Sequence, residues 1–296
     1  MIVDPAELKT SLVHSYMLGA IAPRPIAFAS TVDGQGNPNL APFSFFNAFG
    51  SNPPVVVFSP SRRVRDNTTK HTLENIREVP EVVINVVTYA MVRQASLAST
   101  EYPKGVNEFV KAGFTPLQSK LIKPFRVKES PVQFECRVLE VKETGEQGGA
   151  ANLIICEILL MHIDDDVLNS EKKIDANKLD LVARMGGDLY CRASGAALFK
   201  VAKPISTLGI GVDNLPDTIR LSNILTGNNL GQLGNLEKLP DENSIHEFRR
   251  RDFMKELINR YGNNKNIFRE KMHELAKALL EKDQVEEALL VLMCSV

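Results

Sequence analysis

The segment from residue 61 to residue 72 has the composition of an anion-binding loop. Basic side chains and hydroxyls follow one another closely here: Arg62, Arg63, Arg65 and Lys70, with Ser61, Thr68, Thr69 and Thr72. A helix is predicted to begin just beyond, so free backbone N–H groups and the positive end of a helix dipole would add to the charge. Such donors suit a phosphate or another anion. The alternative is a solvated basic loop in which Thr72 only caps the helix.

Several familiar catalytic motifs are absent from the sequence. It contains no Walker A loop, no Gly-x-Ser-x-Gly elbow, no His-Glu-x-x-His and no Gly-x-Gly-x-x-Gly. The four cysteines, at positions 136, 156, 191 and 294, form no Cys-x-x-Cys pair, and the histidines are isolated. We therefore expect neither a metal site nor a classical dinucleotide-binding site.

Charge and hydropathy exclude further classes of protein. The chain has 35 Lys and Arg against 36 Asp and Glu, a net charge of −1. Since general nucleic-acid binding and binding to anionic membranes both depend on excess positive charge, we expect neither partner. No apolar stretch is long enough to span a bilayer, and the acidic, proline-containing start of the chain is unlike a signal peptide. A cytoplasmic location is the expectation.

Residues 23–76 are the densest collection of side chains that could form a site. Pro-Arg-Pro at 23–25 leads into an apolar strand that ends in Ser30 and Thr31. Asn-Leu-Ala-Pro-Phe-Ser-Phe-Phe-Asn follows at 39–47, then Asn-Pro-Pro at 52–54 and a strand that leads into Ser59. The basic loop comes directly afterwards.

Turn clusters divide the first part of the chain into short strands. Strands are predicted at 25–32, 40–46, 55–58, 81–87, 133–141 and 152–163, and short helices at 72–77, 89–99 and 107–111. The cluster at 33–37 predicts a hairpin between the first two strands, and the glycine loop at 143–149 predicts another between the last two. This pattern is typical of an antiparallel barrel or sandwich.

The end of the chain has a different character. From residue 243 it lacks proline, and helices with apolar stripes are predicted at 244–261, at 268–279 and from 283 onward. These stripes must pack against the sheet, each other or a second subunit. Gly227–Gly234 is predicted to be a flexible link. The expected organisation is a sheet domain over 1–204, a connecting segment over 205–242 and a helical extension over 243–296.

The order of motifs over residues 16–87 resembles the flavin reductase-like family, and Arg-Met-Gly-Gly-Asp-Leu-Tyr at 184–190 extends the resemblance more weakly. The resemblance implies a mainly β fold, the antiparallel FMN-binding split β-barrel, with peripheral helices and here an α-helical C-terminal extension. It also implies a homodimer with FMN near the subunit boundary. His71 stands where the family commonly has Asp.

The resemblance also implies where FMN would lie. The phosphate would be close to Ser59, Arg62, Arg63, Lys70 and Thr72. The ring would be held by Ala41, Pro42, Phe43 and Ser44, with Ser30 and Thr31 at the ribityl chain or ring edge and Asn47 as a further polar group. For Phe45, Phe46 and Phe49 core packing is the favoured role.

The implied activity is electron transfer from NADH or NADPH through FMN to free flavin or another acceptor. No side chain is assigned as a general acid or base, because the cofactor carries out the chemistry. Arg24 and Arg184 are candidates either for tuning the flavin or for ordinary ion pairs. Two alternatives remain open: a non-catalytic FMN carrier or sensor, and a relative that lost the cofactor and became an interaction module.

Overall fold

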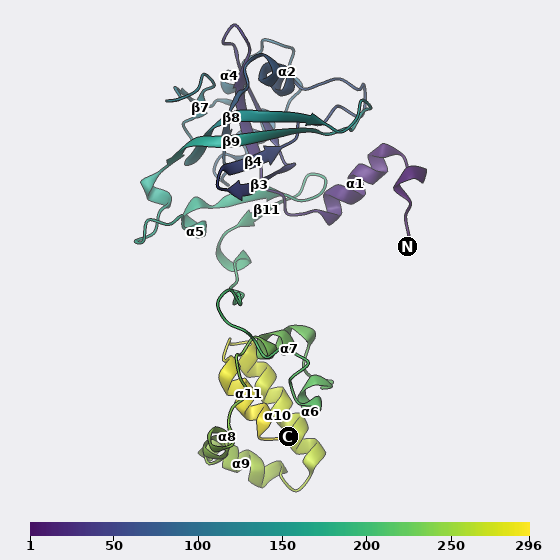
Figure 1. Cartoon of the computed structure of the whole chain (residues 1–296), viewed down its shortest axis with the longest axis vertical. Coiled ribbons are helices and arrows are strands. Elements are labelled where there is room, and N and C mark those ends of the chain that lie inside the picture. Colours follow the sequence, from purple (N-terminus) through teal and green to yellow (C-terminus); the bar gives the residue numbers. More distant parts are fainter. The chain divides into compact units, whose positions relative to one another are not determined.

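The computed structural model describes every residue from Met1 to Val296. The chain folds into two units, Met1–Phe199 and Lys200–Val296. In Figure 1 the first unit runs from purple to teal and holds the strands, while the second runs from green to yellow and contains helices. No helix has both the length and the apolar character that crossing a lipid bilayer requires.

One antiparallel sheet of seven strands forms the centre of the first unit (Figure 1). Its strands are β1 (Ala27–Val32), β2 (Pro38–Phe43), β3 (Phe46–Ser51), β4 (Pro54–Phe58), β5 (Glu81–Asn85), β8 (Val132–Glu143) and β9 (Asn152–Ile163). Their order is β2-β1-β5-β8-β9-β4-β3. The expected mainly β, antiparallel architecture is confirmed. The hydrogen-bonded ladder itself is open between β2 and β3, although only Ser44 and Phe45 separate these edge strands in the chain.

Strand β1 is covered on both of its faces. Alternate side chains of a strand point in opposite directions, so each face packs into its own cluster. Ala27 and Ala29 pack into one hydrophobic cluster, and Phe28 packs into another. All six residues of the strand are buried. The predicted hairpin from β1 to β2 is confirmed by a continuous antiparallel register, and so is the predicted pairing of β8 with β9.

Shorter elements surround this sheet. The helices are α1 (Thr10–Ala20), α2 (His71–Glu78), α3 (Val92–Leu97), α4 (Glu108–Ala112) and α5 (Ala176–Leu179), with 3-10 turns at Pro5–Glu7, Asp165–Val167 and Gly195–Ala197. Two small ribbons pair β6 (Pro116–Leu117) with β7 (Arg126–Val127) and β10 (Leu181–Arg184) with β11 (Tyr190–Ala193). The sequence did not predict α1, which buries none of its residues. Gly113 ends α4 in the left-handed conformation expected of a C-terminal cap.

The second unit has a hydrophobic core of its own. Its helices are α6 (Asp217–Arg220), α7 (Gly227–Gly234), α8 (Glu242–Arg249), α9 (Asp252–Tyr261), α10 (Lys265–Leu280) and α11 (Val285–Met293). Met254, Met272 and Leu289 are buried in one cluster, so the helices pack their apolar stripes against each other. The helix expected over 244–261 is two helices, α8 and α9, and Asp241 caps the first of them.

Residues 205–242 differ from the expected connecting segment. Gly227–Gly234 is helix α7 rather than a flexible link, capped by Thr226 and Asn229, and Leu233 within it is fully buried. Tertiary burial overrides the low helix propensity of glycine here. The glycines also permit close backbone contact, because a Cβ on Gly209 would lie 2.5 Å from the Gly234 carbonyl oxygen.

Candidate functional site

Two hollows in the first unit meet at Pro42 and Ser99. One has a volume of about 200 Å³ and is lined mainly by apolar residues, with Arg184 and Tyr190 on one side. The other has a volume of about 140 Å³ and reaches Arg63 and the start of α2. We call the first the apolar hollow for its aliphatic side chains and the second the cationic hollow for Arg63 and Lys70. The carboxylates of Glu101 and Glu108 also line the second hollow.

Strand β2 positions the residues at the junction. Its register with β1 places Pro42 opposite Phe28, and β2 is an edge strand, where proline costs no ladder hydrogen bond. Ala41, Pro42 and Phe43 line the cationic hollow, and Pro42 with Ser44 lines the apolar one. The segment predicted to hold a planar ring thus borders both compartments.

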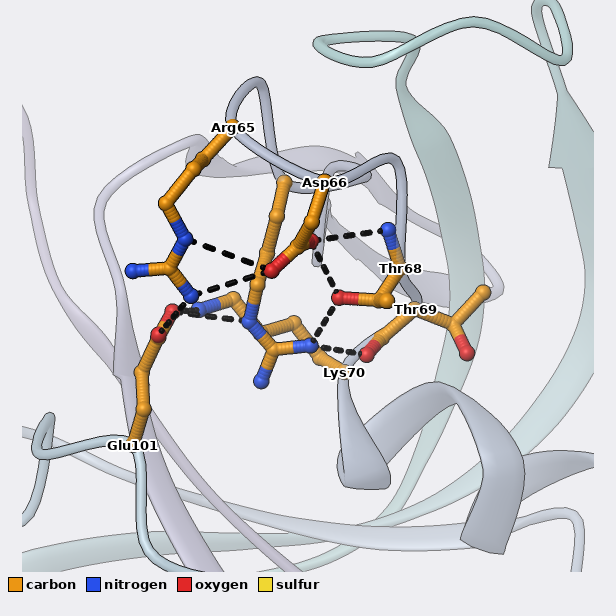
Figure 2. A network of polar contacts seen from close by, with 7 residues as sticks. Arg65, Asp66, Thr68, Thr69, Lys70 and Glu101 are labelled. Atoms are coloured by element: carbon orange, nitrogen blue, oxygen red, sulfur yellow. Dashed lines mark hydrogen bonds and ion pairs between the residues drawn. The ribbon is translucent and has the colours of Figure 1, made fainter.

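Two acidic side chains, Glu101 and Asp66, accept hydrogen bonds from the basic loop (Figure 2). The guanidinium of Arg63 donates to Glu101 Oε1 at 2.7 Å, and Lys70 Nζ donates to the same oxygen at 3.3 Å. Arg65 donates to Glu101 Oε2 at 3.0 Å and also to Asp66. Hydrogen bonds from Arg63 and then Lys70 lower the pKa of Glu101 to about 2. Arg63 and Lys70, which the sequence predicts to bind an anion, are therefore already paired with the ionised carboxylate of Glu101.

Sequence reasoning missed Glu101. It lies 31 residues after Lys70, in an irregular stretch between α3 and α4, and carries no motif of its own. No pattern in the sequence indicates that it faces the loop, because only the fold brings these two segments together.

The first turn of α2 adds backbone donors to the cationic hollow. Lys70 occupies the N-cap position, and no side chain caps the helix. The alternative in which Thr72 only caps the helix is therefore wrong: its Oγ1 accepts a hydrogen bond from Asn39 Nδ2 at 2.9 Å, inside the protein. His71 and Thr72 both line the hollow. The positive end of the helix dipole lies beside Lys70 and Arg63.

The other predicted residues lie outside both hollows. Ser30 and Thr31 are fully buried, Ser59 is buried beside Asn152, and Asn47 is exposed on β3. Arg62 donates to the side chain and backbone of Asn67, so its guanidinium stabilises the conformation of the loop. The structure thus brings together seven of the predicted residues along the hollows: Ala41, Pro42, Phe43, Ser44, Arg63, Lys70 and Thr72.

The apolar hollow contains one available cation. Arg184 lies over the ring of Tyr190 at 4.7 Å and donates to the Gly187 carbonyl. Arg24 by contrast is buried, with 5% of its surface exposed, and its guanidinium donates to carbonyl oxygens of Leu18, Ile21 and Met185. Burial, followed by the charge of Arg184, lowers the pKa of Arg24. Arg24 therefore joins the end of α1 to the turn after β10 through hydrogen bonds and does not face a ligand.

Known proteins are similar in sequence to the first part of this chain. The sequence profile of the flavin reductase like domain matches residues 18–178. An uncharacterized protein of Aquifex aeolicus is 36% identical over 189 residues, which cover 64% of this chain and 94% of that protein. The present chain thus carries a substantial segment without a counterpart in that relative.

Solved structures show the same fold. Nitrilotriacetate monooxygenase component B from Bacillus cereus matches with a TM-score of 0.63 and 27% identity, over 68% of this chain and 98% of its own. A candidate flavin reductase with a split barrel domain from Shewanella frigidimarina matches with a TM-score of 0.56 and 26% identity, over 68% of this chain and its full length. The profile match covers more than half of the chain, and with these structural similarities it shows that the protein belongs to the flavin reductase like domain family.

Proposed function

We propose that the first unit binds FMN and acts as an oxidoreductase of the flavin reductase type, taking electrons from NADH or NADPH. The acceptor would be free flavin or another electron acceptor. The observation that carries this proposal is the junction of an apolar and a cationic hollow at Pro42 and Ser99. Membership of the family supports a flavin as the bound group.

The residues present suit an FMN molecule. A phosphate monoester carries roughly −1.5 to −2 charges at neutral pH. The cationic hollow offers Arg63, Lys70 and the uncapped start of α2 to such a group. The apolar hollow offers aliphatic walls from Ile26, Val87 and other residues, which suit a flat hydrophobic ring.

The protein's own groups would bind and orient the cofactor. Arg63 and Lys70 would hold the phosphate, and backbone groups of residues 41–44 with the Ser44 hydroxyl would bind the polar edge of the ring. The cation of Arg184, held against Tyr190, favours negative charge that develops in the apolar hollow. When bound, FMN would supply the capacity to accept and pass on a hydride. No side chain needs to act as a general acid or base.

The test is flavin retention followed by turnover. The full chain would be incubated with FMN, desalted and examined by visible absorbance, and then assayed for oxidation of NADH and NADPH with excess FMN. We expect a retained two-banded flavin spectrum and steady turnover with at least one nicotinamide. Retention without turnover would instead indicate a flavin carrier or sensor. A colourless protein without turnover would overturn both functions.

We also propose a homodimer, which the exposed apolar residues of α1 support. Leu12, Tyr16 and Met17 are each 40–46% exposed, and no residue of this helix is buried within its own chain. Apolar groups in such a patch are typical of a surface that a partner covers. Light scattering of the full chain should give twice its mass of 32.8 kDa. A monomeric mass at micromolar concentration would contradict the dimer.

A further inference from the structure

The second unit contains a hollow of its own, between α10 and the segment that follows α6. It has a volume of about 560 Å³. Asn266, Arg269, Glu270 and His273 line it from α10, at the spacing of one helical face. Asp217 and Thr218 of α6 and residues 221–224 line it as well. The hollow shares no residue with the flavin-type site, because every residue that lines it belongs to Lys200–Val296.

Several residues that line this hollow carry a buried polar atom without a partner. Five buried side-chain atoms of the protein lack a hydrogen-bond partner, and three of them belong to residues that line it: Thr218 Oγ1, Arg269 Nε and His273 Nε2. A buried polar atom without a partner is costly, and native proteins contain few. Three of them at one hollow therefore point to a ligand that would satisfy them.

The hydrogen bonds of Ser222 determine which ring nitrogen of His273 carries the proton. Ser222 Oγ accepts from the backbone N–H groups of Ile224 and Leu225, at 3.1 and 3.2 Å. Its single proton is thus directed to His273 Nδ1, 2.7 Å away, which must accept it. Burial, followed by the charge of Arg269, lowers the pKa of His273, which favours the neutral ring. The proton of that ring then lies on Nε2, the unpartnered atom.

The buried groups of this hollow are therefore donors. His273 is 3% exposed and offers Nε2–H, while Arg269 makes no ion pair and offers its Nε–H and its charge. The Thr218 hydroxyl can donate as well. The acidic residues lie at the outside: the Asp217 side chain is 74% exposed and pairs with Arg220, and Glu270 is exposed. The interior of the hollow thus suits negative charge.

We propose that this hollow binds a small anion, through a carboxylate or phosphate group held by Arg269, His273 and Thr218. Arg269 would supply the charge, and His273 would supply a fixed N–H whose direction Ser222 sets. A carboxylate and a phosphate both accept such a set of hydrogen bonds. The helical unit would then be a ligand-binding unit attached to the flavin reductase-like unit.

Histidine NMR of the full chain tests this proposal with two probes. The ¹⁵N imidazole signals would be followed while sodium phosphate or sodium acetate is added, with ionic strength balanced by sodium chloride. Absence of one signal in His273→Gln assigns His273. We expect that signal to shift saturably with at least one probe, and the probe that saturates it at lower concentration identifies the class as phosphate or carboxylate. No saturable shift with either probe would overturn the proposal.

Variants separate a site from a general charge effect. Arg269→Gln should weaken binding of the effective probe by roughly tenfold or more, and Arg269→Lys should restore part of it. Thr218→Val gives a second, smaller loss that does not depend on the charge. Arg250→Gln removes an exposed arginine outside the hollow and should change nothing. Equal affinity in Arg269→Gln, Thr218→Val and the unaltered protein would rule out this site.

Discussion

Replacing Arg63 and Lys70 together by glutamine should raise the dissociation constant for FMN by roughly 100-fold. Both side chains line the cationic hollow beside the uncapped start of α2. Each would lose a charge-assisted hydrogen bond to the phosphate, and such bonds are stronger than neutral ones. Fluorescence titration of flavin with the full chain measures the effect. Riboflavin, which lacks the phosphate, should bind both proteins about equally.

Two control variants make this result specific. Arg77→Gln with Lys128→Gln removes the same total charge from residues outside the hollow and should leave FMN affinity unchanged. Glu101→Gln should act in the opposite direction and tighten FMN binding about fivefold, because it removes the anion that competes for Arg63 and Lys70. With its pKa at about 2, Glu101 stays ionised, so this gain should not vary between about pH 7.5 and 9, where the phosphate is fully ionised as well. Equal loss of riboflavin and FMN in the double variant would refute the phosphate assignment.

Arg24→Ala should lower the free energy of unfolding of the first unit by about 3 kcal/mol. The buried guanidinium donates to carbonyl oxygens of Leu18, Ile21 and Met185, and so joins the end of α1 to the β10–β11 ribbon. Alanine would leave these acceptors without their donor and would open a gap beside Ser44. Denaturant unfolding of the full chain, followed by tyrosine fluorescence, reports on this unit, because four of the five tyrosines lie before residue 199.

The control for Arg24→Ala is the same substitution at an arginine on the surface. Arg137 forms an ion pair with Glu157 but is 60% exposed, so Arg137→Ala should cost at most about 1 kcal/mol. The loss in the free energy of unfolding for Arg24→Lys should lie between those of the two alanine variants. One ammonium group cannot donate to three separated carbonyls as a guanidinium does. If Arg24→Ala unfolded at the same denaturant concentration as Arg137→Ala, the fastening role of Arg24 would have to be abandoned.

Local patterns predicted the sheet well. The turn cluster at 33–37 joins β1 to β2, and the glycine loop at 143–149 joins β8 to β9, as expected from residue type alone. The strands predicted at 55–58 and 81–87 are confirmed, because β4 and β5 lie there. Such patterns act over a few residues, which is why they survive into the folded protein.

Long-range packing decides features that local patterns do not predict. Gly227–Gly234 has the composition of a link, but burial of Leu233 and the Thr226–Asn229 cap make it a helix. Ser30 and Thr31 are buried, because β1 is covered on both faces, and their predicted position beside the cofactor stays a prediction. The residues that bury Leu233 and β1 are mostly distant in sequence, and no local pattern contains them.

The sequence by itself determined the motif order of a flavin reductase-like domain, the basic loop and the segment 41–44 that borders it. Only the tertiary structure decided that Glu101 pairs with Arg63 and Lys70, that Arg24 is a buried fastening, and that three unpartnered polar groups meet in the helical unit. The physical reason is that charge and hydrogen-bonding capacity are properties of residues, which a sequence displays. Whether that capacity is satisfied or left open depends on which neighbours the fold supplies.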